Sequence, residues 1–595
     1  MEAFRTLAIL ICCLLFHFTS PLSQSCSTCP PGYPQNNRFD YVIVGAGPAG
    51  LVLAEQLSRN PEVSVLLLEA GVDESSNSNV TIPGFAGNNE FSPRVWDYYV
   101  TPQRELNGAT PRLAQGKLLG GGTGVNYMNY NRGAKSVFDE WAVKSGNDGL
   151  YWRNLIEDFR ATSKVELNVV LEDYKQVISQ EAYGAGPVTL TRAATLDGFD
   201  PSWNAALRST LGLREVDFNS GAGVGVSYGV ESIRAPNRTR MYALPAFGYQ
   251  MAGRQNVVIR TNALVSKINF VNKRADTITY IDTADGATTH TVSAREVILS
   301  AGAIQSPKIL MLSGVGPQEQ LRARGIHIVL HSPYIGSNLR DHNYGSLEIQ
   351  VKPEVYTLSR WQDADYLRQI TEQFQQNATG PLANAPASSF ALVRVPDDAL
   401  PEGPDGDFQR SLAKDRGQLQ IQYANVALLA KTTEADVPVM TLWVALVQPE
   451  ATGTIRLAST NPVDLPLIDT NYFGTPGDRA AVLWGYRKLR EVLASPQMGD
   501  IVEKEIYPGS QAQSDADLWK AIQGGAQSYH HPIGTCALGT VVGADWRVRG
   551  LQGLRVVDAS VFPTPPNCHP QADVYAVAHL AARQIAEADG SWYGR

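Results

Sequence analysis

Three of the nine histidines in this 595-residue chain lie close together near its C-terminal end. His530 and His531 stand in the stretch Ser528–Thr535, and His569 stands within Asn567–Gln571. Histidine is the side chain whose ordinary pKa allows it to accept a proton near neutral pH. The cluster therefore predicts a site of general base catalysis. Structural histidines in a turn are the alternative.

The chemistry that suits such a base is the oxidation of an alcohol. The base removes the hydroxyl proton while the carbon gives up a hydride to a redox cofactor. A second histidine or an asparagine can hold the developing alkoxide. Cys536 and Cys568 lie near the histidines in sequence, which leaves open a disulfide, a place in the pocket wall or a thiol nucleophile. No metal-ligand spacing such as His-x-x-x-His occurs, so we expect no metal.

A nucleotide-binding pattern at the other end of the chain indicates where a cofactor would sit. Tyr41–Val44 predicts a buried strand, Gly45–Gly50 has the form Gly-x-Gly-x-x-Gly, and Leu51–Leu57 predicts a helix. These glycines allow a tight turn, a close approach to a pyrophosphate and the packing of helix on strand, while the helix N-terminus favours phosphate. A second strand ends at Glu69, whose carboxylate can accept both ribose hydroxyls. A tight turn without a ligand is the alternative.

Length and composition limit the classes of protein that fit. A chain of 595 residues favours two domains, and 44% hydrophobic with 18% charged residues indicates a globular protein. The net charge of −8 gives no basic face for a nucleic acid, so we expect no nucleic-acid partner.

The N-terminal stretch predicts secretion. The apolar run from Leu7 to Phe18 is followed by small polar residues, which predicts a signal peptide over residues 1–25. An uncleaved anchor is the alternative, and later runs are too short for a stable membrane association. Sequons at Asn79, Asn237 and Asn377 fit a secreted glycoprotein. For Cys26 and Cys29 we expect a local disulfide or a pair of little consequence.

Two further patterns bear on the domain organisation. Gly116–Asn126 is dense in small residues, so its backbone can lie flat against a planar ligand. Alternating or apolar runs predict strands at 257–261, 263–270, 277–282, 289–292 and 439–447, and a further buried strand over 296–302 that ends at glycine. The stretches 554–558 and 575–586 return to strand-then-helix character. The second domain is therefore expected to be inserted into the nucleotide-binding one.

Three longer motifs carry a family resemblance. The block Gly116–Asp139 resembles the first signature of the glucose–methanol–choline (GMC) oxidoreductases, and Gly302–Gly316 resembles the second. Gly336–His342 is similar to the family's G-x-N-L-x-D-H turn. The resemblance runs from about residue 38 to 590 and implies FAD as the dinucleotide.

The resemblance also implies the cofactor contacts, which fall on Gly45, Gly47, Gly50, Glu69, Gly121, Asn126, Val265, Asp558 and Ala559. Some family members attach FAD covalently to a histidine in the first signature region. No histidine occurs between His17 and His290, so we expect non-covalent FAD.

For the catalytic residues, the resemblance implies that His531, directly before Pro-x-Gly-Thr, is the base and that His569 is its partner, as in aryl-alcohol oxidases. Tyr127 matches an aromatic residue that stacks over the substrate in those enzymes, with a core tyrosine as the alternative. His530 departs from the aromatic residue that lines their substrate funnel, which implies a more polar pocket. The other histidines are expected to be structural (His342, His579) or to lie at the surface or in packing (His290, His327, His331).

The expected fold class is α/β, a Rossmann-type FAD-binding domain with an inserted α+β substrate domain built on an antiparallel sheet. The FAD-binding domain is expected over 38–345, with parts of the substrate domain near 155–220. The substrate domain follows over 346–520. Residues 521–590 return to the FAD-binding domain and carry the catalytic histidines.

The expected activity is the FAD-dependent oxidation of a primary aryl or allylic alcohol to the aldehyde. Oxygen or a quinone would accept the electrons, and the enzyme would serve fungal secondary metabolism or the breakdown of plant material. The alternatives are a dehydrative cyclase similar to versicolorin B synthases, a sugar dehydrogenase, and a binding protein that keeps FAD without turnover.

Overall fold

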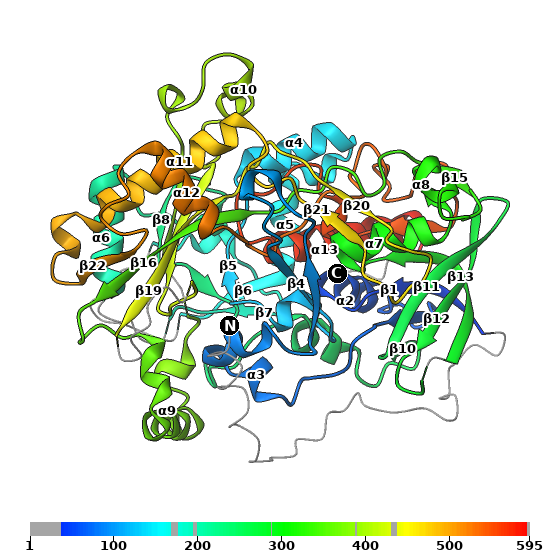
Figure 1. The fold of residues 1–595 in the computed structure, drawn as a ribbon. Helices are drawn as coiled ribbons and strands as arrows, with labels where there is room; N and C mark the ends of the chain where they lie inside the picture. Colours follow the sequence, from blue (N-terminus) through cyan, green and yellow to red (C-terminus); the bar gives the residue numbers. More distant parts are fainter. Residues whose placement is uncertain are drawn as a thin grey trace.

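The computed structural model describes residues 37–167, 177–193, 199–286, 288–386, 389–429 and 437–591. Two parts lie side by side, each built around a seven-stranded sheet (Figure 1). The predicted signal peptide and the pair Cys26 and Cys29 fall outside the described residues. Within those residues, no helix is long and apolar enough to cross a membrane.

The first sheet has a parallel core in which neighbouring strands come from distant parts of the chain. Its order is β10 (Val257–Arg260), β2 (Val65–Leu68), β1 (Arg38–Val44), β13 (Thr288–Leu299) and β24 (Leu554–Val556). Parallel sheets of this kind bind ligands at the carboxyl ends of their strands. The glycine turn after β1, the carboxylate after β2 and the segment after β24 all lie at that edge.

The strand β13 pairs with different strands along its two halves. Its C-terminal half pairs with β1 in parallel, and its N-terminal half pairs antiparallel with β12 (Arg274–Asp282), which continues into β11 (Ala263–Val271). The two runs predicted at 289–292 and 296–302 are therefore one continuous strand, which ends at Leu299. This three-stranded extension brings β11 to the cofactor edge of the sheet.

Helices cover the parallel core. The helix α2 (Pro48–Leu57) begins directly after Gly47, with proline in its first turn, where no backbone N–H is needed. It packs along α13 (Gln571–Ala588), so the blue and red ends of the chain lie together (Figure 1). Other helices of this part include α4 (Lys135–Ser145), α5 (Trp152–Thr162), α7 (Gly302–Leu312) and the short α8 (Gln318–Arg322).

The second sheet is antiparallel, as predicted. Its order is β22 (Val502–Tyr507), β16 (Asn343–Val351), β19 (Val439–Leu446), β18 (Leu419–Ala424), β17 (Phe390–Val393) and β8 (Gly225–Ser227). Every residue of β19 is buried, which explains its uninterrupted apolar sequence. The helices of this part are α6 (Phe199–Leu211), α9 (Ala364–Asn377), α10 (Pro404–Ser411), α11 (Pro476–Leu493) and α12 (Asp515–Gly524).

One segment joins the two sheets and carries the histidine cluster. The short strand β23 (Gln527–Ser528) pairs antiparallel with the start of β16. A few residues later the chain reaches the end of β24, where the backbone of Gly534 donates to Ala559 and that of Cys536 donates to Ser560. The residues between these two anchors, His530 and His531 among them, are thereby held between the sheets.

Candidate active site

A cavity of about 2320 Å³ extends from the carboxyl edge of the first sheet to the histidine cluster. Gly45 and Glu69 line one end, and His531 and His569 also line its wall. The described residues thus form one continuous space for a cofactor and a substrate.

Glycines make the first end of the cavity flat. Gly45 has φ of +100°, and a Cβ on Gly50 would lie 1.9 Å from the carbonyl oxygen of Gly45. A Cβ on Gly121 would lie 2.7 Å from the Cα of Gly47, so the two glycine-rich segments touch backbone to backbone. Side chains at Gly50 and Gly121 would collide with neighbouring backbone, so the turn and its contact with the second glycine-rich segment require glycine at both positions.

Glu69 ends β2 at the cavity wall and is 7% exposed. Its Oε2 accepts from the backbone N–H of Ala46 at 2.8 Å, and its Oε1 accepts from that of Gly71 at 2.8 Å. Burial raises the pKa of this carboxyl group, and the backbone donors oppose the rise. Besides facing the cavity, the carboxylate therefore fixes the shape of the glycine turn.

The other predicted cofactor residues lie along the same wall, with one exception. Asn126 is oriented by Arg240, whose Nη1 donates to its Oδ1 at 2.8 Å. Asp558 accepts from the backbone N–H of Gly302 at 2.9 Å. The residues that line the cavity are Gly45, Gly47, Glu69, Gly121, Asn126, Val265, Asp558 and Ala559. Gly50 does not line it and serves the packing of the turn.

His531 contacts a second imidazole that sequence reasoning assigned to structure. Its Nδ1 lies 3.0 Å from the Nδ1 of His342, and the two rings stand at 88°. Only one of two facing nitrogens can carry the hydrogen. Within the described residues no side chain hydrogen-bonds the Nε2 of His531, and the residue lines the cavity. If His531 is to accept a proton at Nε2, its Nδ1 must donate to His342.

His569 has both ring nitrogens engaged. Its Nδ1 lies 3.0 Å from the Oδ1 of Asn131, which also accepts from the His569 backbone N–H at 3.2 Å. Its Nε2 lies 3.2 Å from the hydroxyl of Tyr529. The rings of His531 and His569 are 5.4 Å apart at 82°. The nitrogen without a side-chain partner suits His531 for proton transfer, whereas Asn131 and Tyr529 fix the orientation of the His569 ring.

Burial keeps all three imidazoles neutral. It lowers the pKa of His342 and of His569 to about 3, and it holds the pKa of His531 well below the ordinary value, with the neighbouring histidines adding to the effect. A neutral imidazole is the form that can accept a proton.

The turn that resembles G-x-N-L-x-D-H positions this loop. Asp341 Oδ1 accepts from the backbone N–H of His531 at 2.7 Å, and its Oδ2 accepts from the Ser528 hydroxyl at 2.6 Å and from the hydroxyl of Tyr472. Asp341 is 3% exposed, and burial raises its pKa. The motif thus places a carboxylate and His342 against the loop that carries His531.

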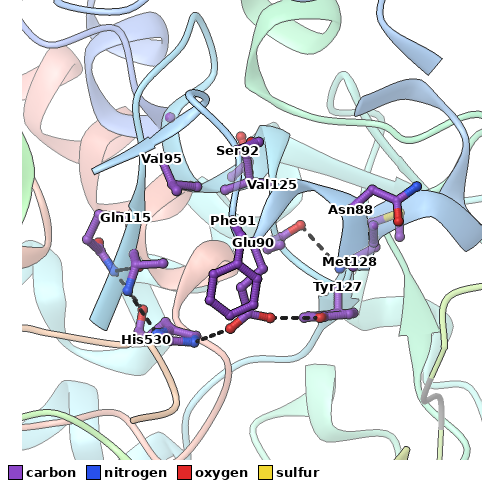
Figure 2. Close-up of a pocket in the computed structure, with 18 of the residues that line it drawn as sticks. Asn88, Glu90, Phe91, Ser92, Val95, Gln115, Val125, Tyr127, Met128 and His530 are labelled. Carbon is purple, nitrogen blue, oxygen red and sulfur yellow. Dashed lines mark hydrogen bonds and ion pairs between the residues drawn. The ribbon is translucent and has the colours of Figure 1, made fainter. Parts of the chain in front are cut away.

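A second polar group lies around Glu90, which sequence reasoning missed. Tyr127 and His530, predicted near the substrate, both line the cavity, and Figure 2 shows Glu90 between them. The Tyr127 hydroxyl donates to Glu90 Oε2 at 3.4 Å, and His530 Nε2 lies 3.6 Å from Oε1. Glu90 follows a polar loop without a motif, so no pattern marked it.

The two cysteines take no part in the cavity. Cys536 and Cys568 are buried and free, so a disulfide between them is ruled out. Burial raises the pKa of both thiols, and the Cys568 thiol donates to Asp573 at 2.9 Å. A thiol nucleophile and a place in the pocket wall are therefore both wrong as interpretations.

The predicted sequons and the absence of a metal remain predictions. Asn237 and Asn377 are exposed, whereas the Oδ1 of Asn79 accepts from Asn88 at 3.0 Å. At the β12–β13 hairpin, potential ligand atoms of three residues lie within 4.8 Å of one another: Asp282, Asp285 and His290. None of these three lines the cavity.

Comparison with known proteins identifies the family. The GMC oxidoreductase model for the N-terminal region matches residues 39–344, and the one for the C-terminal region matches residues 449–578. The chain therefore belongs to the GMC oxidoreductases, which confirms the resemblance. It is an oxidoreductase that acts on CH–OH groups, and its cofactor is FAD.

Several curated relatives match along nearly their whole length. Pyranose dehydrogenase 3 of Leucoagaricus meleagris is 30% identical, over 94% of each chain. Patulin synthase of Aspergillus clavatus is 29% identical, over 94% of this chain and 93% of its own. Versicolorin B synthase of Emericella nidulans is 30% identical, over 93% and 90%.

Solved structures agree on the fold. Formate oxidase of Aspergillus oryzae superposes with a TM-score of 0.85 at 25% identity, over 93% of this chain and 99% of that one. A fungal aryl-alcohol oxidase superposes with a TM-score of 0.80 at 24% identity, over 93% and 99%. These neighbours confirm the predicted Rossmann-type domain with an added substrate domain.

Proposed function

We propose that this enzyme oxidises a primary aryl or allylic alcohol to the aldehyde. FAD, when bound along the glycine-lined wall, supplies the acceptor for the hydride. His531 accepts the hydroxyl proton at Nε2. The resulting charge is shared with His342 through the contact between the two Nδ1 atoms.

The observation that carries this proposal is the unequal use of the two histidines. His531 lines the cavity and has one nitrogen occupied by His342, and within the described residues no side chain hydrogen-bonds the other. His569 is held at both nitrogens by Asn131 and Tyr529. A base needs an accessible lone pair, and a positioning group needs a fixed orientation.

The aromatic wall supports a flat, apolar substrate. The ring of Tyr529 meets those of Tyr344 and Trp443 edge to face, at 5.4 and 6.0 Å, and all three residues line the cavity. Aromatic side chains pack favourably against another ring in such geometries. An aryl or allylic alcohol would fit between this wall and the bases.

Anaerobic mixing of the FAD-loaded enzyme with a panel of alcohols tests the proposal. We expect primary aryl and allylic alcohols to bleach the flavin absorbance and to yield aldehydes. A matched panel of secondary and saturated alcohols serves as the control. The proposal fails if no primary aryl or allylic alcohol reduces the flavin, or if the saturated alcohols reduce it faster.

Two other functions are distinguished by the same experiment. The likeness to versicolorin B synthase favours a non-redox cyclisation as the second candidate, which would show turnover without bleaching. The likeness to pyranose dehydrogenase 3 favours a sugar as substrate, which would show bleaching by pyranoses in preference to aryl alcohols. Neither bleaching nor turnover would indicate a binding protein.

We further propose that the enzyme is secreted, binds FAD without a covalent bond and serves a fungal secondary-metabolite pathway. The apolar run Leu7–Phe18 supports the first point, and the lack of a histidine in the first signature region supports the second. The likeness to patulin synthase supports the third.

Sequencing the N-terminus of the mature protein in culture medium tests secretion. Release of FAD on denaturation tests the mode of attachment, and reoxidation by oxygen against a quinone identifies the electron acceptor.

A further inference from the structure

A carboxylate faces the substrate end of the cavity without a role in proton transfer. Glu90 follows the 3₁₀ helix η1 (Pro83–Asn89), lines the cavity and has a side chain that is 30% exposed. Figure 2 shows its carboxylate between the ring of His530 and the hydroxyl of Tyr127. His530, which contacts this carboxylate, directly precedes the base in sequence, and all three residues line the same cavity.

The partners of this carboxylate do not use all the hydrogen bonds that its two oxygens can accept. Arg112 Nη1 approaches Oε1 at 3.3 Å, His530 Nε2 lies 3.6 Å from Oε1, and the Tyr127 hydroxyl lies 3.4 Å from Oε2. Charge-assisted hydrogen bonds are usually shorter, at about 2.7–2.9 Å. A carboxylate has about four acceptor sites. Glu90 can therefore accept one more hydrogen bond from the cavity side.

The group stays ionised in this setting. Burial raises the pKa of Glu90, but His530, Arg112 and Tyr127 outweigh that effect and lower it overall. An ionised carboxylate only accepts hydrogen bonds, so it selects for a donor on the ligand.

His530 is oriented to support Glu90 and not to act as a base. Its Nδ1 accepts from the backbone N–H of Ala114 at 3.1 Å, so the ring hydrogen is at Nε2, on the side of Glu90. Its backbone has φ of +61°, which is unfavourable for a residue with a Cβ. Strain of this kind tends to be kept where a side chain must point in one direction.

The surroundings favour a neutral donor over a cation. The guanidinium of Arg112 contacts Glu90, pairs with Asp97 and lies 4.3 Å above the ring of Phe91, so a cation is already present beside the carboxylate. Phe91 is 68% exposed and Tyr127 is 38% exposed, and both line the cavity. Together they offer ring surface beside a single acceptor.

We propose that Glu90, held by His530, Arg112 and Tyr127, binds a second hydroxyl group of the substrate. The preferred substrates are then diols or hydroxylated aryl alcohols, in which one hydroxyl is oxidised at His531 and the other donates to Glu90. This assignment rests on the function proposed above and adds the substrate class to it.

Two isomeric alcohols test the assignment. In 1,4-benzenedimethanol the second substituent ends in a hydroxyl donor, whereas in 4-methoxybenzyl alcohol it has no donor. Their binding is measured by anaerobic calorimetry on the FAD-loaded His531→Ala protein, in which flavin reduction is expected to be slow. We expect the diol to bind about tenfold more tightly, because a hydrogen bond to a charged group is involved.

Variants in the same background locate the effect. Glu90→Gln is expected to reduce the tenfold ratio to about twofold, and Glu90→Leu to abolish it. Asp407→Asn is the control, since Asp407 also pairs with an arginine, Arg410, but neither residue lines the cavity. It should leave the ratio unchanged. FAD content and thermal unfolding verify that each variant is folded.

Four results would overturn the assignment. Three of them are equal affinities for the two isomers, a ratio that stays at about tenfold in Glu90→Gln, and tighter binding of the cationic 4-(aminomethyl)benzyl alcohol than of the diol. Undetectable binding of every donor-bearing alcohol would also overturn it. Failure of the proposed function is recorded separately, as a wild-type flavin that no primary alcohol reduces.

Discussion

The two polar ends of the substrate cavity differ in how they treat charge. Around His531, buried imidazoles contact one another and are kept neutral. Around Glu90, His530 and Arg112 lower the pKa of a partly exposed carboxyl group and keep it ionised. One end is therefore prepared to receive a proton, and the other to receive a hydrogen-bond donor without exchanging protons.

This difference indicates how one cavity can combine reaction and recognition. A base must change its charge during each turnover, so it is placed where the starting state is uncharged. A group that recognises the substrate must keep the same charge, and the ion pair with Arg112 keeps Glu90 negatively charged. The closeness of His530 to His531 in sequence hides this separation, because adjacent imidazoles serve opposite ends.

Loss of the base itself should have the largest effect. His531→Ala removes the proton acceptor, and general base catalysis contributes about 10²–10⁴-fold, so flavin reduction should slow by that factor. FAD should be retained, because His531 is not among the predicted cofactor contacts. Stopped-flow absorbance at neutral pH measures the rate, and the visible spectrum measures FAD content. Near-normal reduction would refute the assignment of the base.

Removal of the neighbouring imidazole should have the next largest effect. His342→Leu deprives the His531 Nδ1 of its acceptor, which lies 3.0 Å away, so the tautomer with a free Nε2 is no longer favoured. We expect flavin reduction to slow by about tenfold to a hundredfold. His342→Gln supplies a carbonyl acceptor and should recover part of the rate. Equal rates in the two variants would show that His342 only fills space.

Acid stability should distinguish the buried imidazoles from ordinary ones. His569 has a folded pKa of about 3, below the ordinary value of about 6.5. Its contribution to stability is complete above pH 6.5 and is lost as the pH falls toward 3, because only the unfolded chain takes up the proton. The loss is at most about 1.4 kcal/mol per pH unit.

His569→Asn lacks this titration, so its melting temperature should fall less between pH 6.5 and 4.5 than that of the wild type. Differential scanning calorimetry of both FAD-loaded proteins measures the two slopes. His327→Asn, which changes a histidine outside the cavity lining, is the control. Parallel slopes in wild type and His569→Asn would argue against a depressed pKa at His569.

The smallest effect is expected at the recognition end. Arg112→Gln removes the cation 3.3 Å from Glu90, so the pKa of Glu90 rises toward its ordinary range. Binding of 1,4-benzenedimethanol should then weaken about twofold to threefold on going from pH 7 to pH 4.5, but not in the parent protein. Calorimetry in the His531→Ala background measures it. A loss of the same size in the parent would mean that Arg112 does not set the charge of Glu90.

Much of the fold could be predicted because its signals are local. The strand, glycine turn and helix over 41–57 lie next to one another in sequence, and each follows its own periodicity. The pairing of β8 with β17 was not predictable, because strand partners distant in sequence leave no local pattern. The continuity of β13 was missed for the same reason: its two halves serve different neighbours.

The site was predictable to the extent that motifs mark it. His531 and His569 stand in recognisable motifs, and the structure brings their rings together. The role of His342 depends on the pairing of β16 with β23, so its sequence suggested only a structural histidine. Glu90 follows a loop of ordinary polar residues, and its contacts come from three other segments.

The central claim is that the catalytic base is an imidazole kept neutral by burial, and one measurement tests it directly. It is the rate of anaerobic flavin reduction by a saturating primary aryl alcohol, recorded in wild type from pH 5 to pH 8. Because the pKa of His531 lies well below the ordinary value, the rate should stay constant over this range. A fall in rate on acidification with a midpoint near pH 6.5 would contradict the claim, since it would show a base that titrates like an exposed histidine.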